Sequence, residues 1–347
     1  MSPACGKIAV VLFNLGGPDG PADVRPFLQN LFGDPAIIAA PAFIRRPLAA
    51  LVARLRETSA KANYAVMGGG SPLLAHTTDQ AVALENILSD QLPQAWVKAF
   101  VAMRYWHPYT REAAAAVVRF CPDQIVLLSL YPQFSTTTTA SSLAAWREAY
   151  RGPGQSRAVC CWYDNDGLIE AHAARIRDTW DAAGRPKVRL LFSAHGLPRG
   201  IASSGDPYQW QVEATCAGVA ARLGGGWDWQ VCYQSRVGPM KWLEPSTPDA
   251  IRAAAADGLG VLIDPIAFVC EHIETLVELD RDYAAFAKAA NAPVYLRAPA
   301  VGTHPAFIDG LADVVRRALE RSDVAPAGEG CPAALGRCGR RLARATP

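Results

Sequence analysis

The chain has 347 residues, 50% of them hydrophobic, and its 34 basic and 32 acidic residues leave a formal net charge of +2. This length exceeds what one hydrophobic core usually supports, so it predicts two domains. The balanced charge excludes the basic footprint of a nucleic-acid-binding protein. The first residues, MSPACGK, show no signal-peptide pattern, and no apolar run approaches the roughly 18 residues that cross a bilayer. We therefore expect a cytoplasmic protein that binds no nucleic acid.

The first half of the chain alternates apolar strands with helices. Strands are predicted at residues 8–15, 96–103 and 124–130, and helices at residues 111–120 and on through Trp146. Fully apolar strands between helices are typical of a parallel sheet that is covered on both faces. The segment RGPGQSR, residues 151–157, predicts a break after this first lobe.

The second half repeats this pattern without repeating the sequence. Strands are predicted at residues 188–193, 229–233 and 260–268, and a last helix at residues 305–321. We expect an α/β protein with lobes at residues 1–155 and 156–304, followed by a final helix and a loosely ordered tail at 305–347. Open α/β sheets bind ligands at the carboxyl ends of their strands, so a cleft between the lobes is the expected site.

His195 follows the predicted strand VRLLFS and precedes GLPRG, so it should emerge from a strand end. An imidazole at such a position can act as a base near neutral pH or ligate a borderline metal ion. A structural histidine bonded to a neighbouring backbone carbonyl is the alternative. Position alone leaves both interpretations open.

The segment CEHIETLVELD gathers acidic residues directly after the predicted strand at 260–268. On a regular α-helix, Glu271, Glu274 and Glu278 would fall in one line. His272 would then lie roughly opposite Glu274, so both can face one site only if the segment starts non-helically or contains a π-bulge. A solvated charged face is the simpler alternative. If the carboxylates instead face the cleft, their repulsion should raise at least one carboxyl pKa, and with a histidine they would suit Fe²⁺ or a similar divalent ion.

The segment MRYWHPYT, which begins at Met103, also follows a predicted strand. The guanidinium of Arg104 suits a carboxylate, and the neighbouring Tyr105 and Trp106 would offer flat, polarizable surface. The cluster therefore fits a large planar acid better than a phosphate, with an ordinary core stripe as the alternative. Ser135 begins the run STTTTASS, whose hydroxyls could bind an anion, although capping of the following helix is the favoured interpretation.

Two further segments have open interpretations. Residues 27–38, FLQNLFGDPAII, are apolar and broken by proline. We interpret them as a hydrophobic lip of the cleft that accepts a hydrophobic ligand from a membrane, with ordinary core as the alternative. The nine cysteines are scattered, which indicates reduced thiols and not a disulfide framework. Cys331 and Cys338 differ from the others because they lie together in a polar tail.

Taken together, these motifs resemble the ferrochelatase family. The matching blocks, in the family's order, are LFNLGGPDGPADVRPFLQNLFGDP, GGGSPL, MRYWHP, LYPQFSTTTTASS, SAHGLP, YQSRVGPMKWLEPST and EHIETLVELD. The resemblance implies a chelatase fold, in which two Rossmann-like lobes, each a parallel sheet flanked by helices, surround a porphyrin cleft. It also implies a lyase that inserts Fe²⁺ into protoporphyrin IX to give protohaem and two protons, the last step of haem biosynthesis.

The resemblance also assigns roles to the candidate site residues. His195 and Glu274 would flank the porphyrin centre from opposite sides and serve the metal and the pyrrole protons. We expect His195 to be the principal proton acceptor and the first metal contact. His272 and Glu278 resemble the neighbouring acid–base and cation-path residues.

Binding of the macrocycle is expected to involve a second group of residues. Arg104 and Tyr105 resemble the residues beside the ring and its propionates, and Met103 and Ser135 complete the candidates. The implied partners are protoporphyrin IX and ferrous iron. Peripheral contact with a membrane is expected because the porphyrin is sparingly soluble, and the chain is expected to be a monomer or a homodimer.

Some members of the family carry a [2Fe–2S] cluster on cysteines of a C-terminal extension and one internal cysteine. Here Cys331 and Cys338 would be joined by Cys160 or Cys161, but four thiolates are the usual requirement, so we favour a protein without the cluster. The alternative enzyme is a related chelatase that acts on coproporphyrin III or inserts cobalt. A tetrapyrrole carrier without catalysis is the alternative from another class, although a carrier would not need His195 beside clustered carboxylates.

Overall fold

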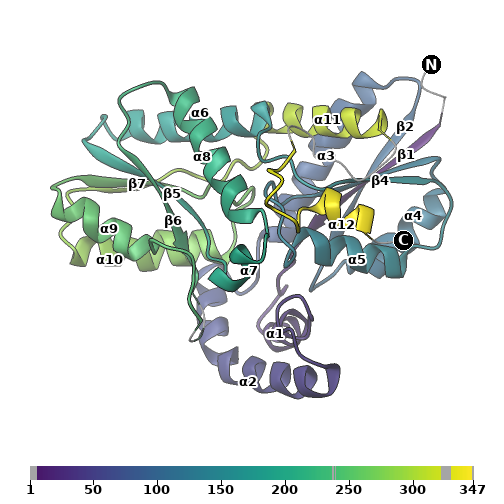
Figure 1. Cartoon of the computed structure of the whole chain (residues 1–347), viewed down its shortest axis with the longest axis horizontal. Coiled ribbons are helices and arrows are strands. Elements are labelled where there is room, and N and C mark those ends of the chain that lie inside the picture. Colours follow the sequence, from purple (N-terminus) through teal and green to yellow (C-terminus); the bar gives the residue numbers. More distant parts are fainter. Residues whose placement is uncertain (1–5, 237, 239, 322–329, 346–347) are drawn as a thin grey trace. The chain divides into compact units, whose positions relative to one another are not determined.

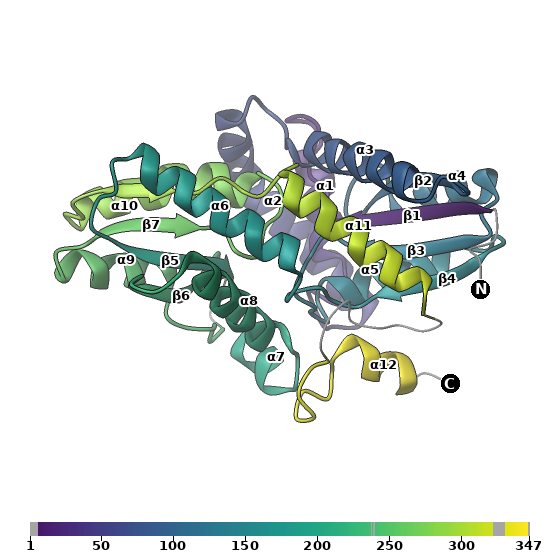
Figure 2. The same cartoon turned by 90° about the horizontal axis from the view of Figure 1, so that it is seen from above.

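The computed structural model describes residues 6–236, 238, 240–321 and 330–345. The chain divides into unit 1, made of Met1–Leu130, Ser135–Cys160 and Ala312–Ala325, and unit 2, made of Tyr131–Phe134, Cys161–Leu311 and Pro326–Pro347. Within the described residues each unit contains one four-stranded parallel sheet flanked by helices (Figures 1 and 2). The predicted α/β class with two parallel-sheet lobes is confirmed.

The sheet of unit 1 has the strand order β2-β1-β3-β4. Its elements are β1 (Lys7–Asn14), α1 (Val24–Phe32), α2 (Ala42–Val66), α3 (Leu73–Gln91), β2 (Trp96–Met103), α4 (Thr110–Phe120), β3 (Gln124–Ser129), α5 (Thr139–Ala149) and β4 (Gln155–Val159). Alternate residues of β1, such as Val11 and Phe13, pack with α4 and α5, while α3 packs against β1 and β2. This covering on both faces explains why residues 8–13 of β1 and 125–128 of β3 are all apolar.

The predicted break at residues 151–157 is wrong. Gln155–Val159 forms β4, which pairs in parallel with β3, and the boundary between the units follows Cys160. The segment QSRAV is an edge strand whose first two residues are exposed, so it lacks the apolar run by which the other strands were recognised. The predicted final helix is present as α11 (Pro305–Leu319), and the boundary between the units passes through it.

The sheet of unit 2 has the strand order β6-β5-β7-β8. Its elements are α6 (Asp166–Ala182), β5 (Val188–His195), α7 (Arg199–Ser203), α8 (Tyr208–Leu223), β6 (Trp229–Gln234), α9 (Thr247–Ala256), β7 (Gly260–Asp264), the π-helix η1 (Glu274–Tyr283), α10 (Ala284–Ala289), β8 (Tyr295–Arg297) and α12 (Gly339–Ala345). Leu190 and Phe192 of β5 pack with α6 and α8, and Leu191 packs with α9, η1 and α10. The carboxyl ends of β5, β6 and β7 therefore lie between two helical layers.

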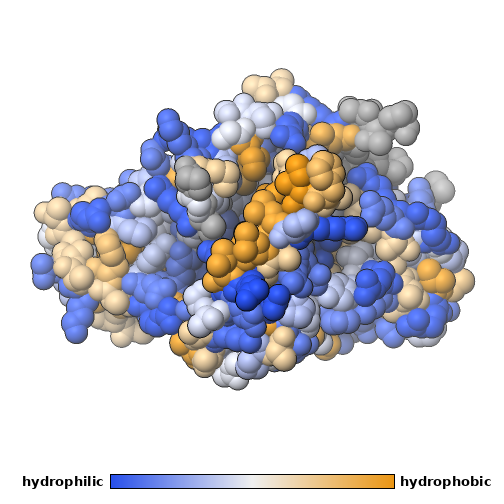
Figure 3. All heavy atoms as spheres, turned by 90° about the horizontal axis from the view of Figure 1, so that it is seen from below, coloured by the Kyte–Doolittle hydropathy of each residue, from blue (hydrophilic) through white to orange (hydrophobic). Residues whose placement is uncertain are grey.

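The exposed apolar surface of unit 1 lies mainly outside the predicted lip, in which Ile37 is exposed. Phe27 and Leu28 of the predicted lip are buried, whereas the next helix, α2, exposes a series of large apolar side chains. They are Phe43 (78% exposed), Ile44, Leu48, Leu51 and Leu55 (72%), and we call them the α2 apolar face. Figure 3, viewed from the side on which α2 lies, shows a band of hydrophobic side chains. No helix in the described part of the chain is both long and apolar enough to span a membrane.

Candidate active site

His195 ends β5, which lies between β6 and β7. Its Nδ1 atom is 2.6 Å from the carbonyl oxygen of Gly196, and because a carbonyl only accepts, we infer that Nδ1 carries the proton. The lone pair of Nε2 then faces the Glu274 carboxylate, with 3.8 Å between Nε2 and Oε2. The bond to a neighbouring backbone carbonyl, which the sequence offered as the structural alternative, is thus present at Nδ1, and it leaves Nε2 directed at Glu274.

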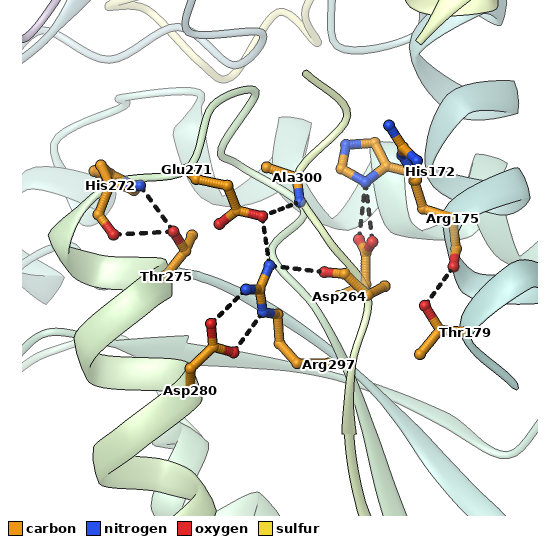
Figure 4. A network of polar contacts seen from close by, with 11 residues as sticks. His172, Arg175, Thr179, Asp264, Glu271, His272, Thr275, Asp280, Arg297 and Ala300 are labelled. Carbon is orange, nitrogen blue, oxygen red and sulfur yellow. Dashed lines mark hydrogen bonds and ion pairs between the residues drawn. The ribbon is translucent and has the colours of Figure 1, made fainter. Parts of the chain in front are cut away.

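His272 reaches the same site because the chain around it is not a regular α-helix. His272 precedes η1, the π-helix that begins at Glu274, which confirms the predicted departure from α-helical geometry. The Oγ1 atom of Thr275 accepts from the His272 amide at 2.9 Å and donates to the His272 carbonyl at 3.0 Å (Figure 4). Burial lowers the pKa of His272, although Glu274 and Glu271 act in the opposite direction. A neutral, buried imidazole can accept a proton near pH 7.

Glu278 is held by four donors. Its Oε1 atom accepts from the Ser235 amide at 2.9 Å and from the Tyr283 hydroxyl at 2.7 Å. Its Oε2 atom accepts from Gln234 Nε2 at 3.0 Å and from the Ser235 hydroxyl. Gln234 Nε2 also donates to the Glu274 carbonyl at 3.0 Å. These donors fix the spacing of Glu274 and Glu278 on η1.

Sequence reasoning assigned no role to Gln234, Ser235 or Tyr208. A usable signal existed, because Gln234 and Ser235 directly follow the predicted strand at 229–233, and Gln234 pairs in the sheet with His195. Ser235 has a φ of 62°, an unusual backbone conformation for a residue other than glycine and one that is often found at functional sites. The Tyr208 hydroxyl donates to the His195 carbonyl at 3.0 Å, and burial raises the pKa of Tyr208, so it stays a protonated donor.

The predicted line of three carboxylates is wrong for Glu271. Its Oε1 atom accepts from Arg297 Nη1 at 2.5 Å and from the Ala300 amide at 2.8 Å. Burial alone would raise the pKa of Glu271, but the charge of Arg297 and the hydrogen bonds from Thr275 and Ala300 outweigh it and lower that pKa. Glu271 is therefore an ion-paired anion, and the repulsion expected among the three carboxylates does not act on it.

The expected placement of His195 and Glu274 on opposite sides of a porphyrin is not what the structure has. A flat ring between them would need roughly 7 Å, two van der Waals contacts of about 3.5 Å each, and the two atoms are 3.8 Å apart. They lie on one side of any ring that they contact. Two ligands that are each about 2.1 Å from one ion lie at most about 4.2 Å apart, so this pair could share a divalent ion. In the described residues no group of three or more His, Cys, Asp or Glu side chains is arranged to hold a metal ion.

The candidate binding residues at the end of β2 form an internal network in unit 1. Arg104 Nη2 lies 2.7 Å from Asp34 Oδ2, and the Tyr105 hydroxyl donates to the same oxygen at 2.8 Å. Burial would raise the pKa of Asp34, but hydrogen bonds from Ser141 and the Ala36 amide, and the charge of Arg104, lower it. Met103 and Tyr105 are 0% and 2% exposed, so the flat ligand-facing surface predicted for them is not present.

Ser135 is buried and its hydroxyl bonds within its own turn. Ser135 Oγ is 2.9 Å from Thr137 Oγ1 and accepts from the Thr137 amide at 3.2 Å. The favoured capping role is wrong, because α5 has Thr138 at its N-cap and no side-chain capping bond there.

The C-terminal cysteines lie beside α8 in unit 2. Gln211 Nε2 donates to Cys331 Sγ at 3.1 Å. Hydrogen bonds from Cys161, Gln211 and Cys338, with the charge of Arg341, outweigh burial and lower the pKa of Cys331 to about 6. Cys161 is thus an internal cysteine that contacts Cys331. Cys161, Cys331 and Cys338 are three thiols, and a [2Fe–2S] cluster usually has four thiolate ligands.

The predicted loosely ordered tail is in part folded. Residues 330–345 include the short helix α12, and the Arg337 amide donates to the Gly205 carbonyl at 3.1 Å. Residues 322–329 and 346–347, which the same prediction included, lie outside the described residues.

Comparison with known proteins defines the class to which this fold and site belong. The sirohydrochlorin chelatase SirB from Bacillus subtilis subspecies spizizenii, solved with cobalt, superposes with a TM-score of 0.52 at 13% identity, over 90% of this chain and 96% of that one. At this identity the likeness establishes the fold alone, which is a chelatase-like fold.

Sequence comparison gives the family. The ferrochelatase family model matches residues 7–319. Ferrochelatase from Phenylobacterium zucineum is 59% identical over 96% of this chain and 98% of its own length, and ferrochelatase from Caulobacter vibrioides is 62% identical over 91% of each. The chain belongs to the ferrochelatase family.

Proposed function

We propose that this protein inserts Fe²⁺ into protoporphyrin IX, giving protohaem and two protons, as the last step of haem biosynthesis. The observation that carries the proposal is the 3.8 Å approach of His195 Nε2 to Glu274 Oε2, next to the buried imidazole of His272. Within one unit, these residues combine proton acceptors with a pair of groups that can ligate a divalent ion.

The proton balance of the reaction explains the need for bases. Each of the two pyrrole N–H bonds breaks as its nitrogen binds iron, so two protons leave while the porphyrin becomes a dianion. His195 Nε2 carries a lone pair, and burial favours the neutral form of His272, so each can accept a proton. Glu274 and Glu278 provide negative charge beside these imidazoles, which stabilises them once they are protonated.

The metal substrate must lose its water shell before it meets the ring nitrogens. Glu274 and His195 can replace water ligands in turn, because carboxylate and imidazole both suit ferrous iron. Glu278 is held by Ser235, Tyr283 and Gln234, so it is more firmly oriented than Glu274. We assign Glu274 to exchange of the metal and Glu278 to the support of the ion's approach.

The test is anaerobic iron insertion followed by the absorbance of haem. The protein should metallate protoporphyrin IX with Fe²⁺, and His195→Ala should lower kcat by at least about 100-fold, the scale of general-base catalysis. His76→Ala, on α3 of unit 1, is the matched histidine control and should retain activity. Near-normal insertion by His195→Ala would contradict the assigned role of His195.

The choice of tetrapyrrole and metal needs its own comparison. We propose protoporphyrin IX and iron, with coproporphyrin III and cobalt as the competing substrates. Steady-state kcat/KM for both porphyrins with Fe²⁺ and with Co²⁺ ranks them directly. Tight porphyrin binding without metallation by either ion would instead favour a carrier.

Arg104 is proposed to bind a porphyrin propionate, with Met103, Tyr105 and Ser135 supporting its position from within the core. The support for this role is the partly exposed guanidinium of Arg104, which is anchored at Nη2 by Asp34 and at Nε by the Ser141 hydroxyl. Arg104→Met should raise the KM for protoporphyrin more than it lowers kcat. A neutral porphyrin ester, which lacks the propionate charge, should show no such change.

Peripheral membrane contact of a cytoplasmic protein is proposed through the α2 apolar face, which exposes Phe43, Ile44, Leu48, Leu51 and Leu55. Large exposed apolar patches mark membrane or protein contacts. Sedimentation with neutral lipid vesicles should be weaker for Phe43→Ser/Leu55→Ser than for the parent protein. Light scattering without vesicles separates a monomer from a homodimer that buries the same face.

The proposed function uses no [2Fe–2S] cluster, because the set of Cys161, Cys331 and Cys338 lacks a fourth thiolate. Anaerobically purified protein should lack the visible absorption of such a cluster. A cluster spectrum that Cys331→Ser abolishes would overturn this statement.

A further inference from the structure

The π-helix η1 needs support from outside itself. A π-helix pairs residues five apart, is rare, and usually persists only where its surroundings hold it. One support comes from the end of β6, where Gln234 and Ser235 bind the side chains and carbonyl of Glu274 and Glu278. Those contacts are part of the candidate active site. A second support comes from β8.

Arg297, the last residue of β8, binds two carboxylates that flank the catalytic residues in sequence. Its Nη1 atom is 2.5 Å from Glu271 Oε1, before η1 begins. Its Nε atom donates to Asp280 Oδ1 at 2.7 Å, and its Nη2 atom donates to Asp280 Oδ2, within η1. Figure 4 shows both carboxylates directed at the one guanidinium. The Arg297 side chain is only 12% exposed, so these bonds are largely shielded from water.

Because both carboxylates bind one guanidinium, they restrict the backbone conformation of the residues between them. Glu271 and Asp280 are nine residues apart in the sequence. In a continuous α-helix this separation corresponds to about 13 Å along the axis and to opposite faces of the helix. One planar guanidinium could not bind both groups there. The contacts of Arg297 are therefore compatible with the observed turn and π-helix, and incompatible with one regular α-helix that runs from Glu271 to Asp280.

Neighbours of Arg297 reinforce the same arrangement. The Tyr295 hydroxyl donates to the Leu279 carbonyl at 2.6 Å, inside η1. The Ala300 amide donates to the Glu271 carboxylate at 2.8 Å. A strand and the residues after it thus hold both ends of the segment, while the guanidinium supplies the ionic contacts that join those ends.

We propose that Arg297 is a positioning residue that fixes the π-helical register of Glu274 and Glu278 and thereby sets the rate of metal insertion without touching either substrate. The effect on rate rests on the proposed function, whereas the effect on η1 does not. Loss of the guanidinium leaves Glu271 and Asp280 without their shared cation and frees the segment to shift toward α-helical pairing. The carboxylates of Glu274 and Glu278 are chemically unchanged by this loss, but their positions relative to each other change.

The first test measures kinetics of Arg297→Met and Arg297→Lys in iron insertion. Arg297→Met should lower kcat by at least 10-fold and change the KM for protoporphyrin by less than 2-fold. Arg297→Lys should recover part of that loss, because an ammonium can pair with one carboxylate at a time. Arg189→Met is the matched control: Arg189 bridges Asp228 and Asp257 with three hydrogen bonds at the other end of the same sheet. It should leave kcat unchanged.

The second test follows amide hydrogen exchange of residues 274–283 and does not depend on activity. Arg297→Met should lose protection there, and Arg189→Met should not. If Arg297→Met does not fold, Arg297→Lys and Asp280→Asn take its place, because each removes only part of the bridge. Unchanged protection, a kcat equal to that of Arg189→Met, or a loss confined to KM would overturn the proposal. Protection lost as expected in a protein that metallates no porphyrin would refute the proposed function and leave the role of Arg297 in η1 standing.

Discussion

The ends of β2 in unit 1 and of β5 in unit 2 look alike in sequence and differ in what their residues do. Arg104 and Tyr105 follow an apolar strand, and both are bonded to the buried carboxylate of Asp34. His195 also ends an apolar strand, yet its side chain is 41% exposed and its Nε2 faces Glu274. A buried carboxylate thus anchors Arg104 and leaves 24% of its side chain exposed, whereas more of the His195 side chain is open to a ligand.

Within unit 2, the carboxylates also differ in the kind of partner that binds them. Glu271 is engaged by Arg297, in the way that Asp34 engages Arg104. Glu274 and Glu278, a few residues later, accept hydrogen bonds from the neutral groups of Gln234 and Ser235. An arginine thus holds Glu271 in an ion pair, whereas neutral donors orient the two candidate site carboxylates.

The largest expected effect comes from removing one reactive charge. Glu274→Gln keeps the size of the side chain and should lower kcat for iron insertion by about 1000-fold, since both metal exchange and proton transfer lose their anion. Stopped-flow metallation measures it. Glu213→Gln, on the exposed side of α8, is the control. Equal rates for the two variants would contradict a special role for the Glu274 carboxylate.

The next effect concerns stability in unit 1. Asp34→Ala leaves Arg104 and the Tyr105 hydroxyl without their partner, so the free energy of unfolding should fall by about 3 kcal/mol, the scale for breaking a buried ion pair. Urea denaturation measures it. Glu57→Ala removes the surface pair with Lys61 in the same unit and should change stability little. Similar losses for both variants would remove the distinction between buried and surface pairs.

A smaller effect should appear in the dependence of stability on pH. Burial lowers the pKa of His272 in the folded protein below its usual 6.5, so the unfolded chain binds more protons once the pH falls through that value. Stability should therefore decline as the pH falls below about 6.5. His272→Gln should flatten this decline. Burial also lowers the pKa of His304, so His304 should account for part of the decline that the variant still shows. An unchanged slope in thermal melts would show that His272 takes up its proton equally in both states.

The smallest expected effect is a difference in thiol reactivity. Cys331 has a pKa of about 6, so most of it is thiolate, the reactive form, at pH 7. Cys121 of unit 1 is exposed and therefore more accessible to a reagent. Iodoacetamide should therefore modify Cys331 before Cys121, as peptide mass analysis can follow. Faster reaction at Cys121 would mean that exposure outweighs the hydrogen bonds from Cys161 and Gln211.

The sequence predicted those parts of the fold that depend on local pattern. The strands β1, β3 and β7 were found because their central residues are buried on both faces of a sheet, which requires uninterrupted apolar residues. The spacing of His272 and Glu274 predicted a non-α-helical segment, because a site that uses both residues excludes regular helical geometry. The edge strand β4 was missed, because one exposed end removes the apolar signal.

Only the tertiary structure decided which charged or polar group meets which. Nothing near Glu271 in the sequence indicates that Arg297 binds it, or that Asp34 binds Arg104, since these partners arrive from distant elements. The same holds for the contact of Cys161 with Cys331 and for the donors that Ser235 presents to Glu278. Local pattern encodes burial and periodicity, whereas the free energy of a buried charge depends on partners that only folding brings within hydrogen-bonding distance.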